Sequence, residues 1–168
     1  KNWNQNTSEF GSTKNDDRSI QTYLDGIKSQ VDISKIKSKN LKVALDLGNG
    51  AQTITAIKLC EQLGCETIAI NQEIDGTFSG RGPEPTPYNL EELSSAVVNN
   101  NADLGVAFDG DGDRSIFCDN TGKLLSGDKS ALLLSNYLLK KNPNSKVVTC
   151  INSGNSIDEI VRQTNSTV

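Results

Sequence analysis

A strand, a helix and a second strand follow one another within residues 41–71, and this order constrains the fold more than any other feature. The run LKVALDL, residues 41–47, is short and apolar and ends in a Gly-Asn-Gly turn. Apolar residues then recur with helical spacing from 54 to 63, and ETIAIN, residues 66–71, is rich in β-branched residues. A strand–helix–strand unit of about thirty residues is typical of a parallel crossover. The segment therefore predicts an α/β fold.

The chain after this unit continues to alternate. Residues 73–88 contain three glycines and three prolines at positions 76, 80, 82, 83, 85 and 87, which predicts a long loop. Asn89 is expected to cap a helix over 90–100 that turns Leu93, Val97 and Val98 inward. Two strands are expected at 104–108 and 115–118, followed by a turn at 120–122. Together these elements predict a mixed, mostly parallel sheet with helices on both faces.

Both ends of the chain lie outside this sheet pattern. A helix is expected over 16–33, with Ile20, Leu24, Ile27 and Val31 on one face. Towards the other end, a helix capped by Asp128 should present Leu132, Leu133 and Leu138 to its neighbours and end near Lys141. A strand at 146–151 and a helix at 156–164 are expected to begin a new unit.

Charge supports a division into three parts. Residues 1–40 carry a net charge of +2 and the remainder −6, so a boundary is expected near Lys39-Asn40. The chain begins with Lys1 inside a polar stretch, which is typical of a piece cut from a longer protein. We expect residues 1–39 to end a first domain, residues 40–143 to form an α/β domain and residues 144–168 to start a third.

Composition excludes several kinds of chemistry. The chain has no histidine, so catalysis by a serine–histidine or cysteine–histidine pair and histidine metal sites are ruled out. Its four cysteines form no CxxC pair, which predicts reduced and mostly buried thiols. A net charge of −4 without a basic stripe argues against nucleic acid as a partner. No long apolar run or leader segment occurs, so we expect no membrane association and a cytoplasmic location.

Three aspartates alternate with two glycines directly after the apolar strand, in VAFDGDGDRS, residues 106–115. Carboxylates this close repel one another unless a cation or strong hydrogen-bond donors compensate their charge. Oxygen ligands favour Mg²⁺ or Ca²⁺, and open α/β sheets bind ligands at the carboxyl ends of their strands. Asp109, Asp111 and Asp113 are therefore candidate metal ligands, although such a string can also be a solvated turn.

This loop has other interpretations besides a magnesium or calcium site of an α/β sheet. An EF-hand needs Gly at the sixth loop position and Glu at the twelfth, where this chain has Arg114 and Asn120, so that interpretation fails. A haloacid-dehalogenase-type phosphatase also places DxD after an apolar strand, and SGDK, residues 126–129, could supply its later metal and lysine positions. Asp113 stands where such enzymes usually carry Thr or Val, so this remains an alternative. A divalent-cation-binding module without turnover is another.

Arg114 has two interpretations beside these carboxylates. A guanidinium pairs bidentately with phosphate, which would suit an anionic substrate near the metal. An internal salt bridge to one of the aspartates explains the same residue equally well.

The segment as a whole resembles the α-D-phosphohexomutases, the phosphoglucomutase and phosphomannomutase family, whose metal loop reads DGDGDR as residues 109–114 do. The resemblance covers about residues 41–160 in order and spacing. It is carried by LKVALDLGNGA (41–51), FSGRGPEPTPYNLEEL (78–93), NADLGVAFDGDGDR (101–114), DNTGKLLSGDKSALLL (119–134) and VVTCINSGNSIDEI (147–160). The chain departs from the family pattern at Gln52, where a small residue is common, and at Ser79, where Pro is common.

The resemblance implies part of a mutase that interconverts hexose 1-phosphate and 6-phosphate through a phosphoserine and a bisphosphorylated sugar. It implies that Asp109, Asp111 and Asp113 hold Mg²⁺ and that Arg114 faces the phosphosugar, with Lys1 as a second candidate substrate contact. The phosphoserine is expected upstream of Lys1, so this chain alone is expected to be inactive. Its expected partners are a hexose phosphate or bisphosphate and the remaining mutase domains.

Overall fold

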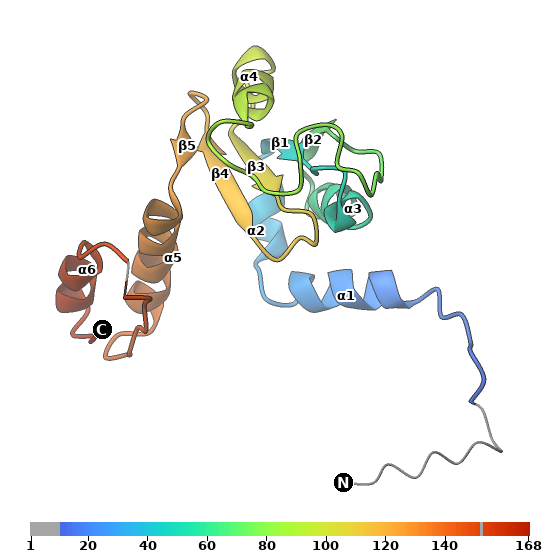
Figure 1. Cartoon of the computed structure of the whole chain (residues 1–168). Helices are drawn as coiled ribbons and strands as arrows, with labels where there is room; N and C mark the ends of the chain where they lie inside the picture. Colours follow the sequence, from blue (N-terminus) through green and yellow to red (C-terminus); the bar gives the residue numbers. More distant parts are fainter. Residues whose placement is uncertain (1–10, 152) are drawn as a thin grey trace, which may run out of the picture. The chain divides into compact units, whose positions relative to one another are not determined.

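The computed structural model describes residues 11–151 and 153–168. The chain divides into two compact units, one that ends at Asp32 and one from Ile33 to Val168. The first unit contains helix α1 (Ser19–Lys28), whose Leu24 is fully buried. The second contains the sheet and the other described helices (Figure 1). In the described residues, no helix has the length and apolar character that a membrane span requires.

Five strands form one mixed sheet in the order β2-β1-β3-β4-β5. Their bounds are β1 (Lys42–Asp46), β2 (Glu66–Ile70), β3 (Leu104–Phe108), β4 (Ser115–Asp119) and β5 (Leu124–Leu125). β1 pairs parallel with β2 and β3, whereas β4 is antiparallel to both β3 and β5. All strands except β4 therefore run in one direction, which confirms the predicted mixed, mostly parallel sheet. The loops after β1 and β3 begin at the same edge.

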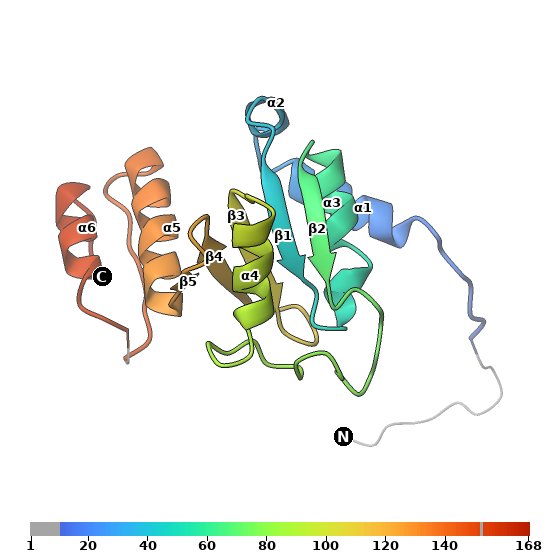
Figure 2. The same cartoon turned by 90° about the horizontal axis from the view of Figure 1, so that it is seen from above.

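Helices cover both faces of this sheet, as expected from the alternation of strands and helices along the chain. Ala44 belongs to a core cluster with Leu93 and Val97 of α4 (Glu91–Asn99). Val43 and Leu45 point to the opposite face, where they cluster with Ala56 of α3 (Ala56–Gln62). Figure 2 shows α3 and α4 on opposite sides of the strands. Ahead of α3, residues Ala51–Thr53 form a short 3₁₀ turn, η1.

Helix α4 starts differently from the sequence expectation. Its N-cap is Leu90, and no side chain caps it, so the predicted capping role of Asn89 is wrong. The Asn89 amide instead donates to the carbonyls of Arg81 and Glu84 at 2.8 and 2.9 Å. Its side-chain oxygen accepts from the Thr86 amide at 2.8 Å. Asn89 thus holds the preceding loop. Val98, predicted to face inward, is half exposed.

Helix α5 (Gly127–Lys141) also has a different cap from the one predicted. Its N-cap is Ser126, whose hydroxyl accepts from the Lys129 amide at 3.4 Å. Asp128 lies in the first turn, where a negative charge suits the helix dipole. Leu139 packs with Ile157 and Val161 of α6 (Ile157–Gln163). Two of the leucines expected to pack, Leu133 and Leu138, are exposed.

The strand expected at 146–151 does not form. A strand needs a hydrogen-bonded neighbour, and in the described part of the chain Lys146 has only an isolated bridge to Thr167. The helix expected over 16–33 is shorter than predicted, because α1 ends at Lys28 and a separate helix, α2 (Ile33–Lys37), follows. Val31 is accordingly exposed.

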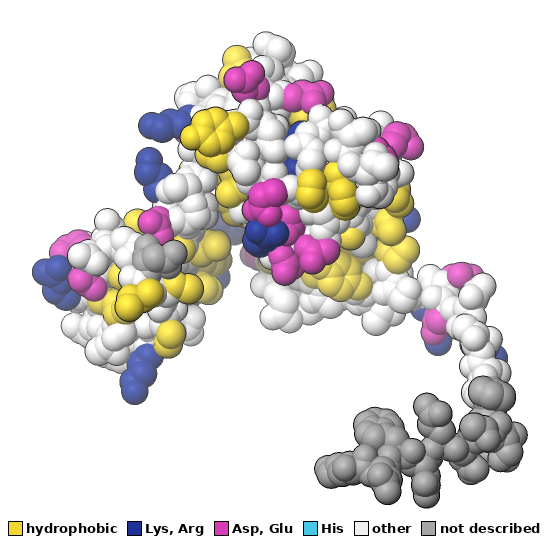
Figure 3. All heavy atoms as spheres, viewed as in Figure 1, with side chains coloured by type: hydrophobic (Ala, Val, Ile, Leu, Met, Phe, Trp, Pro, Cys, Tyr) yellow, Lys and Arg dark blue, Asp and Glu magenta, His cyan; other side chains and the backbone are white. Residues whose placement is uncertain are grey.

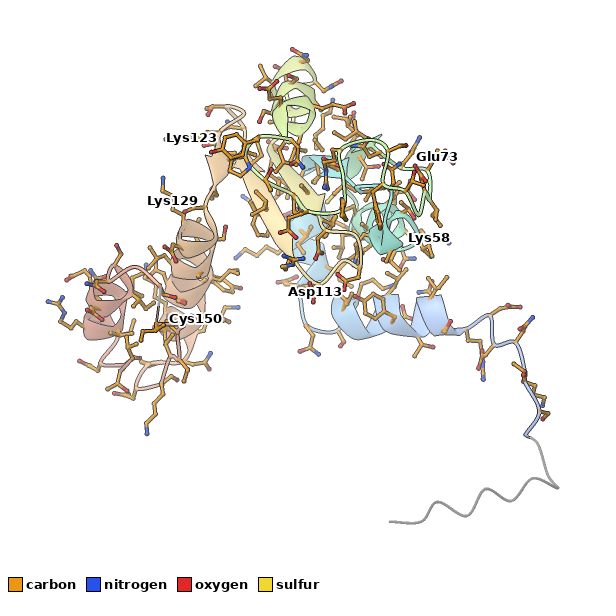
Figure 4. All side chains as sticks on the ribbon, in the orientation of Figure 1. Lys58, Glu73, Asp113, Lys123, Lys129 and Cys150 are labelled. Carbon is orange, nitrogen blue, oxygen red and sulfur yellow. The ribbon has the colours of Figure 1, made fainter. Side chains whose placement is uncertain are left out.

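All four cysteines are free thiols. Cys118 is buried, and Cys60 and Cys65 are half-buried. Burial, with a smaller contribution from the nearby Cys65, raises the pKa of the Cys60 thiol to about 11. Cys150 lies between α5 and α6 and is exposed (Figure 4), so the prediction of buried thiols is wrong for this residue.

Candidate metal centre

The loop between β3 and β4 contains the three predicted metal ligands. Figure 4 shows Asp113 at this turn. Asp109 directly follows β3 and is 1% exposed, whereas Asp111 and Asp113 are exposed. One carboxylate oxygen from each aspartate lies within 4.8 Å of the other two. The loop therefore brings the three side chains together at the carboxyl edge of the sheet.

This arrangement fits a hard divalent cation. Mg²⁺ and Ca²⁺ bind oxygen ligands at roughly 2.0–2.6 Å, so two oxygens on one ion lie at most about 4–5 Å apart. The three carboxylates already meet this limit. The negative charges of the three carboxylates also favour a cation. Two of the side chains are exposed and can adjust their positions to it. The donor set, which is oxygen only, suits a hard cation better than Zn²⁺ or a softer metal.

Arg114 already binds the buried carboxylate of the cluster. Its Nε donates to Oδ2 of Asp109 at 2.8 Å, and its backbone amide donates to Oδ1 at 2.9 Å. Its Nη1 donates to Glu84 at 2.7 Å, across thirty residues of sequence. Figure 3 shows acidic side chains gathered around a basic one on this face. The internal salt bridge considered from the sequence is therefore present, and it has a second partner that the sequence did not indicate.

The neighbours of Asp109 and Asp113 shift their pKa values in opposite directions. Burial raises the pKa of Asp109, but the amide and guanidinium of Arg114 together outweigh it and hold that pKa below the ordinary value. The charges of Asp111 and then Asp109 raise the pKa of Asp113. Asp113 also lies 3.4 Å from Arg114 Nε, but this contact does not offset the repulsion from the two other aspartates.

The turn after β1 supports the aspartate loop from one side. The Ala51 amide donates to the Gly110 carbonyl at 3.0 Å. A Cβ on Gly50 would lie only 2.4 Å from that carbonyl oxygen, so the close approach requires glycine. The Gln52 side chain donates to the Gly112 carbonyl at 3.2 Å. Gln52, which departs from the pattern of similar sequences, therefore contacts the loop directly.

The loop at 73–88 supports the site from the other side through a buried ion pair. Arg81 Nε lies 2.6 Å from Oδ2 of Asp46, at the end of β1, and the two side chains are 4% and 1% exposed. Arg81 Nη2 also donates to the carbonyl of Phe108, the residue before Asp109. Neither residue was singled out from the sequence. The available signals were an acidic residue that ends a buried strand and an arginine within a glycine- and proline-rich loop.

The remaining sequence candidates lie elsewhere. Lys1 falls outside the described residues. Asp128 and Lys129, which could have completed a phosphatase site, line a cavity of about 300 Å³ with Thr149 and Ser153. The described lining of that cavity does not include the three aspartates.

Comparisons with known proteins place this site in context. Residues 21–122 match the family described as phosphoglucomutase/phosphomannomutase, alpha/beta/alpha domain II. The phosphoglucosamine/phosphogalactosamine mutase of Sulfurisphaera tokodaii is 42% identical over 165 residues, 97% of this chain and 36% of the relative. The phosphoglucomutase/phosphomannomutase of Thermococcus kodakarensis is 36% identical over 99% of this chain and 35% of its own length. The chain thus spans about a third of the length of these curated relatives.

A solved structure agrees with these matches. The crystal structure of a phosphoglucomutase/phosphomannomutase family protein from Burkholderia thailandensis superposes with a TM-score of 0.79 at 29% identity. The match covers 88% of this chain and 32% of that protein.

Proposed function

The chain belongs to the phosphoglucomutase/phosphomannomutase family, and on that basis we propose that it supplies the metal-binding part of a phosphohexomutase. The reaction is the interconversion of hexose 1-phosphate and hexose 6-phosphate through a phosphoserine and a bisphosphorylated sugar. The observation that carries the proposal is the convergence of Asp109, Asp111 and Asp113 within 4.8 Å, beside Arg114. The cation that we propose for them is Mg²⁺.

Each residue has a role in this proposal. Asp109 provides a fixed, buried ligand, because Arg114 and the end of β3 hold it in place. Asp111 and Asp113 are exposed and complete the ligand set from this chain. When bound, the cation would offset the negative charge of a transferring phosphoryl group. Arg114 would orient the phosphate through its planar guanidinium, which matches phosphate oxygens in pairs.

Arg114 offers its full set of guanidinium donors to a phosphate only if it changes partners. Its Nε and Nη1 are engaged by Asp109 and Glu84 in this structure. Glu84 is the more exposed partner, with half of its side chain accessible. We expect Arg114 to keep Asp109 and to exchange Glu84 for the phosphate, so that binding breaks the weaker, solvated pair.

The substrate of the proposed enzyme is a hexose phosphate. Relatives are named for glucose, mannose, glucosamine and galactosamine phosphates, so their names support this class without selecting one sugar. The phosphatase alternative has less support, since the family match covers the loop and Asp128 and Lys129 line a separate cavity.

A segment-exchange experiment tests the proposal. The 168 residues replace the matching segment of the Thermococcus kodakarensis mutase, and the chimera is assayed with glucose 1-phosphate and its 1,6-bisphosphate in the presence of Mg²⁺. We expect turnover that depends on the metal and is lost in the Asp111→Asn chimera. A folded chimera that releases phosphate without isomerising the sugar would favour the phosphatase instead.

A further inference from the structure

The Asp46–Arg81 ion pair is buried more deeply than any other ion pair in the described part of the chain. Removing two charges from water costs several kcal/mol per ion, and an apolar pair of similar size is often as stable. Stability alone therefore gives little reason for this pair. Its position gives a better one, because Asp46 ends β1 and Arg81 belongs to the loop that passes beside β3.

Every charged atom of this pair has a defined partner. Oδ1 of Asp46 accepts from the Asn71 side chain and the Gly48 amide, both at 3.0 Å, while Oδ2 accepts from Arg81. Arg81 donates from Nη1 to the Gly82 carbonyl at 3.2 Å and from Nη2 to the Phe108 carbonyl. The guanidinium therefore joins the ends of two neighbouring strands.

We propose that Arg81 is a positioning residue that fixes the start of the aspartate loop by joining the Asp46 carboxylate to the Phe108 carbonyl. The Phe108 carbonyl directly precedes Asp109, so its orientation determines where the Asp109 side chain leaves the sheet. Gly48 makes room for this arrangement, since a Cβ there would lie 2.7 Å from Arg81 Nη2. The proposal rests on the proposed metal site, because it concerns the geometry that this site needs.

Asn89 ties the backbone of Arg81 to that of Glu84. The Asn89 side chain binds the carbonyls of both Arg81 and Glu84, so the loop is tied at two points three residues apart. Glu84 in turn binds Arg114 at the far end of the aspartate loop. The loop at 73–88 therefore contacts both ends of the aspartate loop, through Arg81 at Phe108 and through Glu84 at Arg114.

Lysine cannot replace Arg81 in this role. A guanidinium presents several donors in a rigid plane and reaches two acceptors at once, whereas an ammonium on a flexible stem is a point charge. Arg81→Lys keeps the positive charge beside Asp46 and loses the planar link to Phe108. Removing partners that orient metal ligands typically weakens metal affinity 10- to 100-fold.

Calorimetric titration of the 168-residue chain with Mg²⁺ tests the proposal. We expect Arg81→Lys to bind about tenfold more weakly than the unchanged chain at a temperature where both are folded. The matched control is Arg162→Lys, which makes the same exchange at an exposed arginine of α6 that pairs with Glu159. Its affinity should stay within about twofold of the unchanged chain.

The outcomes separate the two proposals. Equal affinity in the unchanged chain and a folded Arg81→Lys variant would overturn the positioning role and leave the metal site intact. If the unchanged chain binds no Mg²⁺, the metal site itself is wrong and the positioning role fails with it.

A measurement on the unchanged chain covers the case in which Arg81→Lys does not fold. Coupling is reciprocal, so if Arg81 favours the metal-binding geometry, bound metal must stabilise the contacts of Arg81. We expect saturating Mg²⁺ to slow hydrogen exchange of the Arg81 Nε–H at least threefold by nuclear magnetic resonance, and to leave that of the exposed Arg18 unchanged. An unaltered Arg81 rate at saturation would overturn the proposal.

Discussion

Asp109 and Asp113 lie four residues apart in one loop, yet their charges have opposite effects on stability. The folded chain holds the pKa of Asp109 below its ordinary value. Ionised Asp109 therefore stabilises the fold at pH values above the unfolded pKa of about 3.9. This stabilisation is lost as the pH falls through the folded pKa of Asp109. The pKa of Asp113 is raised. The contribution of Asp113 to folding stability is therefore present at acidic pH and is lost as the pH rises through its folded-state pKa.

Asp113→Asn tests this difference. Without metal at pH 7, we expect the variant to have a higher melting temperature than the unchanged chain, because it removes repulsion from Asp111 and Asp109. The gain should disappear near pH 3, where the aspartate is protonated. Thermal unfolding by circular dichroism at both pH values measures it. Asp17→Asn, which removes an equal charge at an exposed position, should show no such gain.

Glu84 and Arg114 offer a second test at the level of single residues. If a phosphate displaces Glu84 from Arg114, removing the Glu84 charge should favour phosphate. We expect Glu84→Gln to strengthen binding of inorganic phosphate to the Mg²⁺-loaded chain about threefold, and Arg114→Lys to weaken it about tenfold.

Calorimetry with phosphate measures both effects. Glu73→Gln, in the same long loop, is the matched control and should behave as the unchanged chain. A Glu84→Gln variant with weaker phosphate binding would mean that Glu84 orients Arg114 for the anion instead of competing with it.

At the scale of elements, the sequence predicted β1 to β4, because their signals are local, but not the two-residue β5. Runs such as LGVAF are apolar and bounded by turn residues. The strand expected at 146–151 has the same local signal and failed, since a strand also depends on a partner that its own residues do not specify. Asn89 failed as a cap for a similar reason: its amide found three partners in the loop at 81–86.

The candidate site was predictable to a similar extent. The aspartates and Arg114 lie within six residues of one another, so a short motif reveals them. Glu84, Arg81 and Asp46 reach the same loop from segments 25 or more residues away, and only the fold brings them there. Pairing over such distances has no local signature in a single sequence.

Gly105 allows a prediction about the packing of helix α4 on strand β3. A Cβ on this β3 glycine would lie 2.7 Å from a methyl group of Val97 and 3.0 Å from one of Leu93, both buried side chains of α4, so Gly105→Ala must displace these side chains. We expect a loss of about 1–3 kcal/mol in the free energy of unfolding, the usual range for overpacking a core. Urea denaturation measures it.

The control for Gly105 is Gly127→Ala at the start of α5, where a Cβ would meet nothing within 4 Å. That variant should be as stable as the unchanged chain or slightly more so, because alanine favours helix. If both alanine variants lost the same stability, close packing of α4 on β3 would not be the cause.

At the scale of the whole molecule, the chain offers an incomplete coordination shell. Mg²⁺ prefers six oxygen ligands, and the three aspartates can supply only part of them. In the proposed enzyme, further ligands would come from the phosphorylated serine and from water. We therefore expect weak binding by the 168 residues, with a dissociation constant near 1 mM, or roughly −4 kcal/mol.

Weak binding still has a measurable effect on unfolding. A ligand that binds only the folded chain stabilises it by RT ln(1 + [L]/Kd), about 1.4 kcal/mol at 10 mM Mg²⁺ if the dissociation constant is about 1 mM. For a protein of this size, that shift corresponds to a rise of about 3–6 °C in melting temperature. We expect this rise for the unchanged chain and less than about 1 °C for Asp111→Asn, measured against NaCl of equal ionic strength to remove general screening. Equal rises in the two proteins would show that Mg²⁺ acts on the surface charge as a whole, and the three aspartates would then be only an exposed acidic loop.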